Sequence, residues 1–183
     1  MSSGVIEVPH GTYRIRTMKI GTSWRASSFV ADHLVFKDTS GPTSEAAIEA
    51  MKARLDERDQ KQRQGWVDGV PSVDSFVEAL QKMEIAEPLK AMLRAHAAAA
   101  DHRMTSIEIA KAGGYKAYTV TATQYGKLGR LIGDYLGMPV SADDEGTGHA
   151  SVLAVAEPAS KKADIVWQLH PTLVEALQKL DLA

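Results

Sequence analysis

Two predicted helices separated by a glycine pair constrain the fold of this chain more than any other feature. Thr105 and Glu108 have the spacing of a capping box, in which the hydroxyl and the carboxylate satisfy free amides at a helix start. Gly113-Gly114 ends that helix after a few residues, and apolar spacing predicts a second helix over about 119–136. Gly137-Met138-Pro139 stops the second helix in the usual order of glycine, then proline. A short helix, a tight turn and a longer helix follow the order of a helix-turn-helix.

Strand-like residues return after these helices, over 150–157 and 163–170, and the loop between the two runs carries Lys161 and Lys162. Helix, turn, helix and hairpin in this order predict a winged helix-turn-helix, in which the hairpin is the wing and its lysines touch phosphates. The alternative is an all-helical packing unit with an accessory hairpin. Helix-turn-helix shapes also serve protein contacts, so the order of elements does not decide the function.

The first third of the chain has the pattern of strands. Strand formers fill 12–20, 24–31 and 33–37 with turn signals between them, which predicts a three-stranded antiparallel meander. Thr43 or Ser44 then caps a helix. The apolar stripe of this helix comprises Ala47, Ile48, Met51 and Leu55. Its polar end, over 53–64, is expected to fray into solvent.

These patterns together predict an α+β protein, with a small βββα unit followed by a winged helix-turn-helix domain. The basic three-stranded sheet and its helix are expected over 1–64, and the winged helix-turn-helix domain over 72–183. Residues 65–71 hold two glycines and a proline, which is typical of a linker.

Composition excludes several other classes of protein. The 183 residues are 44% hydrophobic and include no cysteine, which removes disulfides, thiol catalysis and cysteine-based metal sites. No apolar run approaches the roughly 20 residues of a membrane helix. The first residues lack the basic-then-apolar order of a signal peptide. We therefore expect a cytoplasmic protein of bacterial type with no membrane partner.

Local charge favours DNA contact by the second helix, although the whole chain has a net charge of -2. No acidic residue lies between Gly113 and Arg130. Lysines neutralise phosphates, while Gln and Thr side chains can read base edges. The residues predicted to contact DNA here are Lys116, Tyr118, Thr119, Thr121, Thr123, Gln124, Lys127 and Arg130, together with Lys161 and Lys162 on the wing. A solvated helix face is the alternative.

Gln124 is the best single candidate for base readout, because its amide can bond bidentately to adenine. The rotation of the helix decides whether Gln124 faces the DNA, since a different start would turn Gln124 toward the core and present Thr123 instead.

Gly126 and Gly129 also lie in this helix, where each glycine costs about 1 kcal/mol relative to alanine. Two glycines so close together indicate that something packs against them. Another helix is the favoured neighbour and DNA backbone the alternative.

The predicted sheet is also basic, with five lysines and arginines against Asp32 over residues 10–37. Arg14 and Arg16 share one face of a strand, and Trp24 beside Arg25 is placed to stack on an unpaired base. These three arginines are therefore further candidates for nucleic-acid contact. We favour the simpler interpretation, in which the sheet has one solvated basic face and a core-facing Trp24.

Nothing in the sequence indicates catalysis. The six histidines lie far apart, no metal-binding pair such as H-E-x-x-H occurs, and phosphate-binding and nucleophile motifs are missing. Asp143, Asp144 and Glu145 can hold a divalent ion, but an acidic loop is usually only solvated. We therefore expect no enzymatic activity and no cofactor or metal.

The run from Leu93 to Gly137 resembles winged-helix modules that accompany HNH-type and other nucleases in bacterial modification-dependent restriction systems. The matching residues are Thr105, Ala110, Gly114, Tyr115, Gln124, Tyr125, Gly126, Leu128 and Gly129. The resemblance covers about 45 residues, a quarter of the chain. It implies DNA binding, with a methylated base as one candidate target and a nuclease as a candidate partner. Thr123 departs from the pattern, because such modules often carry Asn before the Gln, and the chain has no nuclease motif.

The leading hypothesis is therefore a protein that binds double-stranded DNA, selective for sequence or modification, acting as a recognition module or regulator, with phage–host defence as one candidate setting. The rival hypothesis is a protein-interaction module, such as an inhibitor or adaptor, that uses the same wing and sheet to bind a protein.

Overall fold

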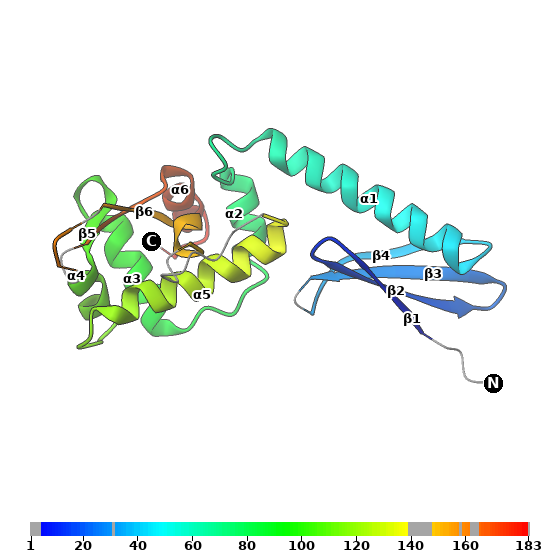
Figure 1. Ribbon diagram of the computed structural model, residues 1–183, viewed down its shortest axis with the longest axis horizontal. Helices are drawn as coiled ribbons and strands as arrows, with labels where there is room; N and C mark the ends of the chain where they lie inside the picture. Colours follow the sequence, from blue (N-terminus) through cyan, green and yellow to red (C-terminus); the bar gives the residue numbers. More distant parts are fainter. Residues whose placement is uncertain (1–4, 31, 139–147, 158, 162–164, 183) are drawn as a thin grey trace. The chain divides into compact units, whose positions relative to one another are not determined.

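The computed structural model describes residues 5–30, 32–138, 148–157, 159–161 and 165–182 (Figure 1). The chain divides into two compact units, Met1–Gln64 and Gly65–Ala183. Both units combine helices with antiparallel strands, so the expected α+β class is confirmed.

The described residues of the first unit form four strands, one more than the sequence predicted. They are β1 (Ile6–His10), β2 (Tyr13–Ile20), β3 (Ser23–Val30) and β4 (His33–Gly41), joined as an antiparallel sheet in chain order. The additional strand β1 pairs Ile6 with Thr17 and His10 with Tyr13. It contains Pro9, which an edge strand tolerates because one side of that strand has no partner. The proline and the short length concealed this strand in the sequence.

Helix α1 (Ser44–Gln64) packs against β2, β3 and β4. Ile15 and Thr17 of β2, with Ala26 and Ser28 of β3, are buried and alternate with exposed or half-buried residues. The buried residues of α1 are Ser44 and the predicted stripe of Ala47, Ile48, Met51 and Leu55.

The end of α1 does not fray as predicted. The Tyr13 hydroxyl of β2 donates to the carboxylate of Asp59 and accepts a hydrogen bond from Arg58 at 2.6 Å. Burial and the hydrogen bond to Asp59 raise the pKa of Tyr13 above its usual range. These contacts attach the polar end of the helix to the sheet.

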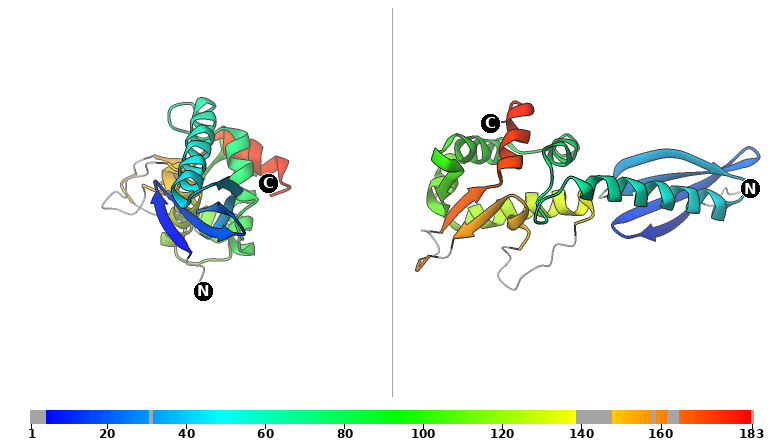
Figure 2. Two further views of the ribbon diagram at one scale, coloured as in Figure 1. Left: turned by 90° about the vertical axis from the view of Figure 1, so that its right-hand side faces the viewer. Right: turned by 90° about the horizontal axis from the view of Figure 1, so that it is seen from above.

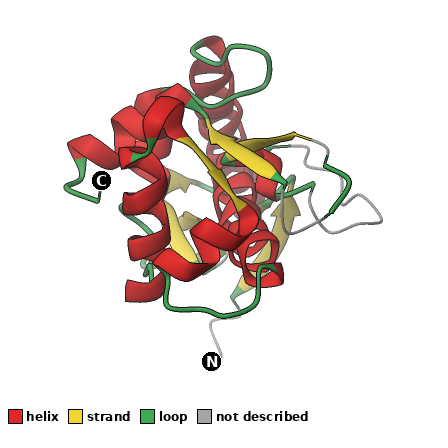
Figure 3. Ribbon diagram, turned by 90° about the vertical axis from the view of Figure 1, so that its left-hand side faces the viewer, coloured by secondary structure: helices red, strands yellow, loops and turns green. Residues whose placement is uncertain are grey.

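The second unit is mostly helical with a small sheet (Figures 2 and 3). Helices α2 (Val73–Leu80) and α3 (Glu87–Ala98) precede β5 (Arg103–Thr105), α4 (Ser106–Ala112) and α5 (Thr119–Leu136). Strands β6 (Ala154–Glu157) and β7 (Val166–Leu169) follow, and α6 (Pro171–Lys179) ends the unit. Single 3₁₀ turns lie at Ala100–His102 and Ala150–Val152. The sheet order is β5-β7-β6, and β5, with three residues, had no sequence signal.

The segment predicted as a linker clusters with the second unit. The Trp66 indole donates to the Ser75 hydroxyl of α2 at 3.1 Å, and Pro71 is buried. Val67 and Val70 form an isolated antiparallel bridge, which makes the glycine at 69 part of a tight turn.

A buried histidine joins three elements of the second unit. His96 of α3 has no exposed surface, and its Nε2 lies 2.9 Å from the carbonyl oxygen of Trp167 in β7. A carbonyl oxygen can only accept a hydrogen bond, so Nε2 carries the proton. Nδ1 then accepts a hydrogen bond from the Tyr125 hydroxyl of α5 at 2.9 Å. Burial lowers the pKa of His96 from 6.5 to about 4. His96 is therefore a satisfied, neutral core residue.

The residue at position 129 of α5 must be glycine because the backbone at His149 lies directly against it. A Cβ added there would lie 1.8 Å from the carbonyl oxygen of His149, just before the 3₁₀ turn at Ala150–Val152. The neighbour of Gly129 is therefore protein, but it is the backbone at His149 and not the other helix that the sequence analysis favoured.

Gly129→Ala should destabilise the protein by roughly 2 kcal/mol, because the methyl group meets backbone that must move, which outweighs the gain in helix propensity. Denaturant unfolding measures this. Arg130→Ala is the control, since it removes only an exposed ion pair with Asp134 and should change the free energy by less than about 0.5 kcal/mol. Equal effects of the two substitutions would contradict the close packing.

The free energy of unfolding should fall as the pH decreases from 6.5 towards 4, by up to about 3 kcal/mol. The pKa of His96 is depressed in the folded state, so its contribution is present above pH 6.5 and is lost as the unfolded state takes up the proton. His96→Gln keeps a donor and an acceptor but does not titrate, so urea unfolding of this variant should show a flatter pH profile. An identical profile would exclude His96 as the cause.

Candidate nucleic-acid interface

The start of α4 is fixed by the predicted capping box. The backbone amide of Glu108 donates to the Thr105 hydroxyl oxygen at 3.4 Å, and the Thr105 amide donates to the Glu108 carboxylate at 2.8 Å. The Thr105 hydroxyl itself donates to the same carboxylate at 2.7 Å. The hydrogen bonds from Thr105 hold the pKa of Glu108 below its usual range. The capping box is therefore confirmed.

The turn between α4 and α5 uses both glycines. Gly114 has a φ of +81°, which favours glycine, and a Cβ on Gly113 would lie 2.7 Å from the side chain of Met92 in α3. Lys116 in this turn is exposed and Tyr118 is half-buried. The turn thus packs on α3 while presenting one cation to solvent.

Thr121 is not available to a ligand, which corrects its prediction as a DNA-contact residue. It has no exposed surface, and its hydroxyl donates to the carbonyl oxygen of Ser106 at 2.7 Å. The indole of Trp167 donates to the Ser106 hydroxyl at 2.8 Å. Thr121 therefore holds the first turn of α5 against the first turn of α4.

The rotation of α5 follows from its buried side. Thr121, Tyr125, Leu128 and Ile132 are buried, and the opposite side is formed by exposed residues at helical spacing: Thr119, Thr123, Lys127 and Arg130, which we call the α5 face. Gln124 lies at the edge of this face and is half-buried. Of these two residues, Thr123 is exposed to solvent and Gln124 is only partly exposed.

The α5 face carries cations and, over its first four turns, no acid. Lys127 has no ion pair with any described residue. Arg130 lies 3.7 Å from Asp134, the first acidic residue of the helix, and 69% of its side chain is exposed. Lys111, exposed in the last turn of α4, adds a cation beside the turn. The sequence reasoning missed Lys111 because it counted charges only from Gly113 onward.

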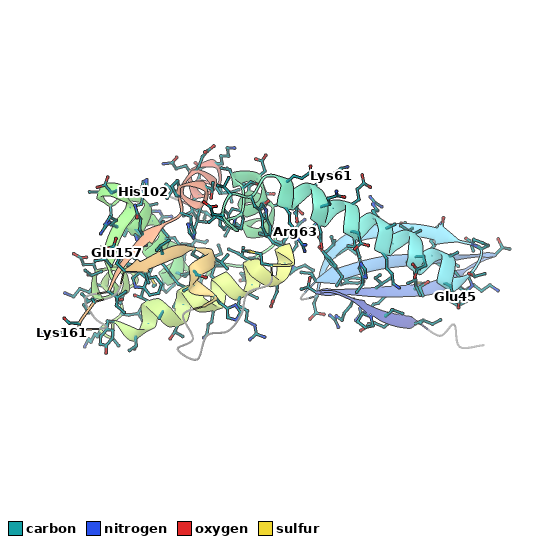
Figure 4. All side chains as sticks on the ribbon, turned by 45° about the horizontal axis from the view of Figure 1, so that its top comes forward. Glu45, Lys61, Arg63, His102, Glu157 and Lys161 are labelled. Carbon is teal, nitrogen blue, oxygen red and sulfur yellow. The ribbon has the colours of Figure 1, made fainter. Side chains whose placement is uncertain are left out.

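The β6–β7 hairpin lies beside the start of α4. Val166 pairs with both Thr105 and Glu157, and the backbone amide of Ser106 donates to the carbonyl oxygen of Ile165 at 2.9 Å. Lys161 is exposed at the hairpin tip, at the same end of this unit as α4 and the start of α5 (Figure 4). Lys162 lies outside the described residues.

The three arginines of the sheet that were predicted to contact nucleic acid, Arg14, Arg16 and Arg25, are each within ion-pair distance of a carboxylate. Arg14 contacts Asp32 and lies 3.7 Å from Glu7, and Arg16 donates to Glu7 at 2.6 Å. Arg16 also lies over the Phe29 ring, 5.0 Å from its centroid. The hydrogen bond from Arg16 lowers the pKa of Glu7.

Arg25 lies 4.0 Å from Asp38, so this sheet face is less positive than the sequence count of residues 10–37 indicated. Trp24 shares the strand face of buried Ala26 and Ser28. That position agrees with the core-facing interpretation and leaves base stacking by Trp24 without support.

No group of three or more His, Asp or Glu suited to a metal occurs within the described residues. Asp143, Asp144 and Glu145 lie outside them. None of the helices in the described part of the chain is long and apolar enough to cross a membrane.

The sequence matches no protein-family model, and no curated protein or solved structure is significantly similar to it.

Thr105→Ala should cost on the order of 1 kcal/mol of stability, because it leaves amides at the start of α4 unsatisfied. Glu108→Ala should cost less, and the double variant less than the sum, because the two side chains form one motif. Thermal or urea unfolding of the three variants measures this, with Lys111→Ala as an exposed control on the same helix. Additive losses would show that the two side chains act independently.

Proposed function

We propose that residues 72–183 form a winged helix-turn-helix that binds double-stranded DNA. In this proposal α4 braces α5, the α5 face enters the major groove, and the β6–β7 hairpin is the wing that contacts phosphates. The observation that carries the proposal is the α5 face, an exposed helix surface on which Lys127 has no ion pair with a described residue and Arg130 is 69% exposed, beside a hairpin that carries Lys161.

The topology supports this assignment. A strand precedes the two helices, a hairpin follows them, and the first strand joins the sheet beside the last one, in the order β5-β7-β6. Pairing of β5 with β7 keeps the hairpin next to the start of α4. The wing and the α5 face would then meet the same duplex.

The role proposed for the protein is recognition or regulation rather than catalysis. The resemblance to modules of modification-dependent restriction systems adds a nuclease as a candidate partner and a modified base as a candidate target. Arg14, Arg16 and Arg25 are also candidates for phosphate contact. They rank second because each would have to give up its carboxylate partner to bind a phosphate.

A protein-interaction module is the second candidate, and the first unit supplies the observation that favours it. Val5, Met18 and Ile20 leave 56%, 40% and 46% of their surface exposed. Val5, Met18 and Ile20 line one shallow groove, which they share with Phe29 and Arg25. Apolar side chains gathered in this way are common where proteins bind proteins.

Lys127→Ala and Lys161→Ala should each weaken binding to every duplex by a similar factor and reduce the slope of log K against log salt by about one. Lys82→Ala is the matched control, because Lys82 is exposed after α2 and outside the proposed surface. Fluorescence anisotropy of the full chain at several salt concentrations measures the slope. Binding to protein but not to DNA, or slopes unchanged in both variants, would favour the protein-interaction module.

A further inference from the structure

The hydroxyl of Thr123 is used inside its own helix. It donates to the carbonyl oxygen of Thr119, one turn earlier, at 3.1 Å. Thr123 is nevertheless exposed, between Thr119 and Lys127 on the α5 face. With the hydroxyl proton used inside the helix, the side chain can offer its γ-methyl and the hydroxyl oxygen as an acceptor to a ligand.

We propose that Thr123 reads the C5-methyl group of a pyrimidine in the major groove. This inference rests on the proposed DNA binding and deepens it. Among the base edges of the major groove, a methyl group is presented by thymine, and the γ-methyl of threonine is one of its usual apolar contacts. Cytosine methylated at C5 presents the same group, so the shared chemistry is a methyl at that carbon.

The surroundings of Thr123 suit an apolar contact placed between charged anchors. Lys127 and Arg130 follow it on the same face and supply cations for phosphates, which carry no sequence information themselves. Gln124 lies half-buried at the edge of the face, so it is less well presented than Thr123. Selectivity for a base at the centre of the α5 face then depends on the fit of the Thr123 side chain to that base and on the contact between the two methyl groups.

The test begins with duplexes selected by the full chain from two random libraries, one unmodified and one with every cytosine replaced by 5-methylcytosine. In the best unmodified duplex each thymine is replaced in turn by deoxyuridine, which lacks only the methyl. In the best methylated duplex each 5-methylcytosine is replaced in turn by cytosine. Loss of the critical methyl should weaken binding roughly three- to fivefold, the value expected for one buried methyl.

Two substitutions at one position separate the methyl from the hydroxyl. Thr123→Val keeps the methyl and removes the hydroxyl, so it should retain the discrimination. Thr123→Ser keeps the hydroxyl and removes the methyl, so it should bind duplexes with and without the critical methyl equally. Circular dichroism and thermal unfolding establish that both variants fold, and Lys82→Ala, which lies outside the proposed surface, is the control that should leave the discrimination unchanged.

The outcomes separate this inference from the proposed function. A methyl effect at thymine identifies unmodified DNA as the source of the group, and an effect at 5-methylcytosine identifies modified DNA. Binding to DNA with no methyl effect overturns the inference and leaves the proposed function standing. Discrimination kept by Thr123→Ser and lost by Thr123→Val also overturns it, because the hydroxyl would then be the reader. No binding to any duplex overturns both.

Discussion

The hydrogen bonds around His96 are the constraint on which the second unit depends. His96 joins α3 to Tyr125 of α5 and to the backbone of β7 at Trp167. The indole of Trp167 continues to Ser106 at the start of α4, whose carbonyl oxygen accepts from Thr121. Leaving any of these buried groups unpaired costs on the order of 1–3 kcal/mol. The helices and the hairpin are thereby held in one arrangement, and a neutral His96 is part of it.

This buried network decides what the unit presents to solvent. Because Thr121 and Tyr125 are fixed inward, Thr123 and Lys127 must face outward on the opposite side of α5. Gly129 allows the backbone at His149 to lie directly on α5, while Thr119, Thr123 and Lys127 remain exposed on the opposite side. A surface for DNA would then need no rearrangement of the core.

The three candidate arginines of the sheet differ from Lys127 of α5 in their ion pairs. In the sheet of the first unit, Arg14, Arg16 and Arg25 each lie within 4.0 Å of a carboxylate. On the α5 face, Lys127 has no such partner among the described residues. A lysine without an ion pair keeps its full attraction for phosphate, whereas a paired arginine must first give up a carboxylate. This contrast is why the proposed DNA contact is assigned first to the second unit.

The sequence by itself determined the local features: the capping box at Thr105, the turn at Gly114, the stripe of α1 and the end of α5 at Gly137. Each depends on residues within a few positions of one another, and their spacing is a local property. Strands β1 and β5 could not be predicted from the sequence. β5 is short and β1 contains Pro9, and each forms only because a partner strand completes its hydrogen bonds. The burial of Thr121, the side position of Gln124 and the neutral state of His96 were also decided by tertiary structure. A helix pattern gives the spacing of its faces, but only contacts from other elements, here Ser106 and Trp167, fix which way the helix is turned.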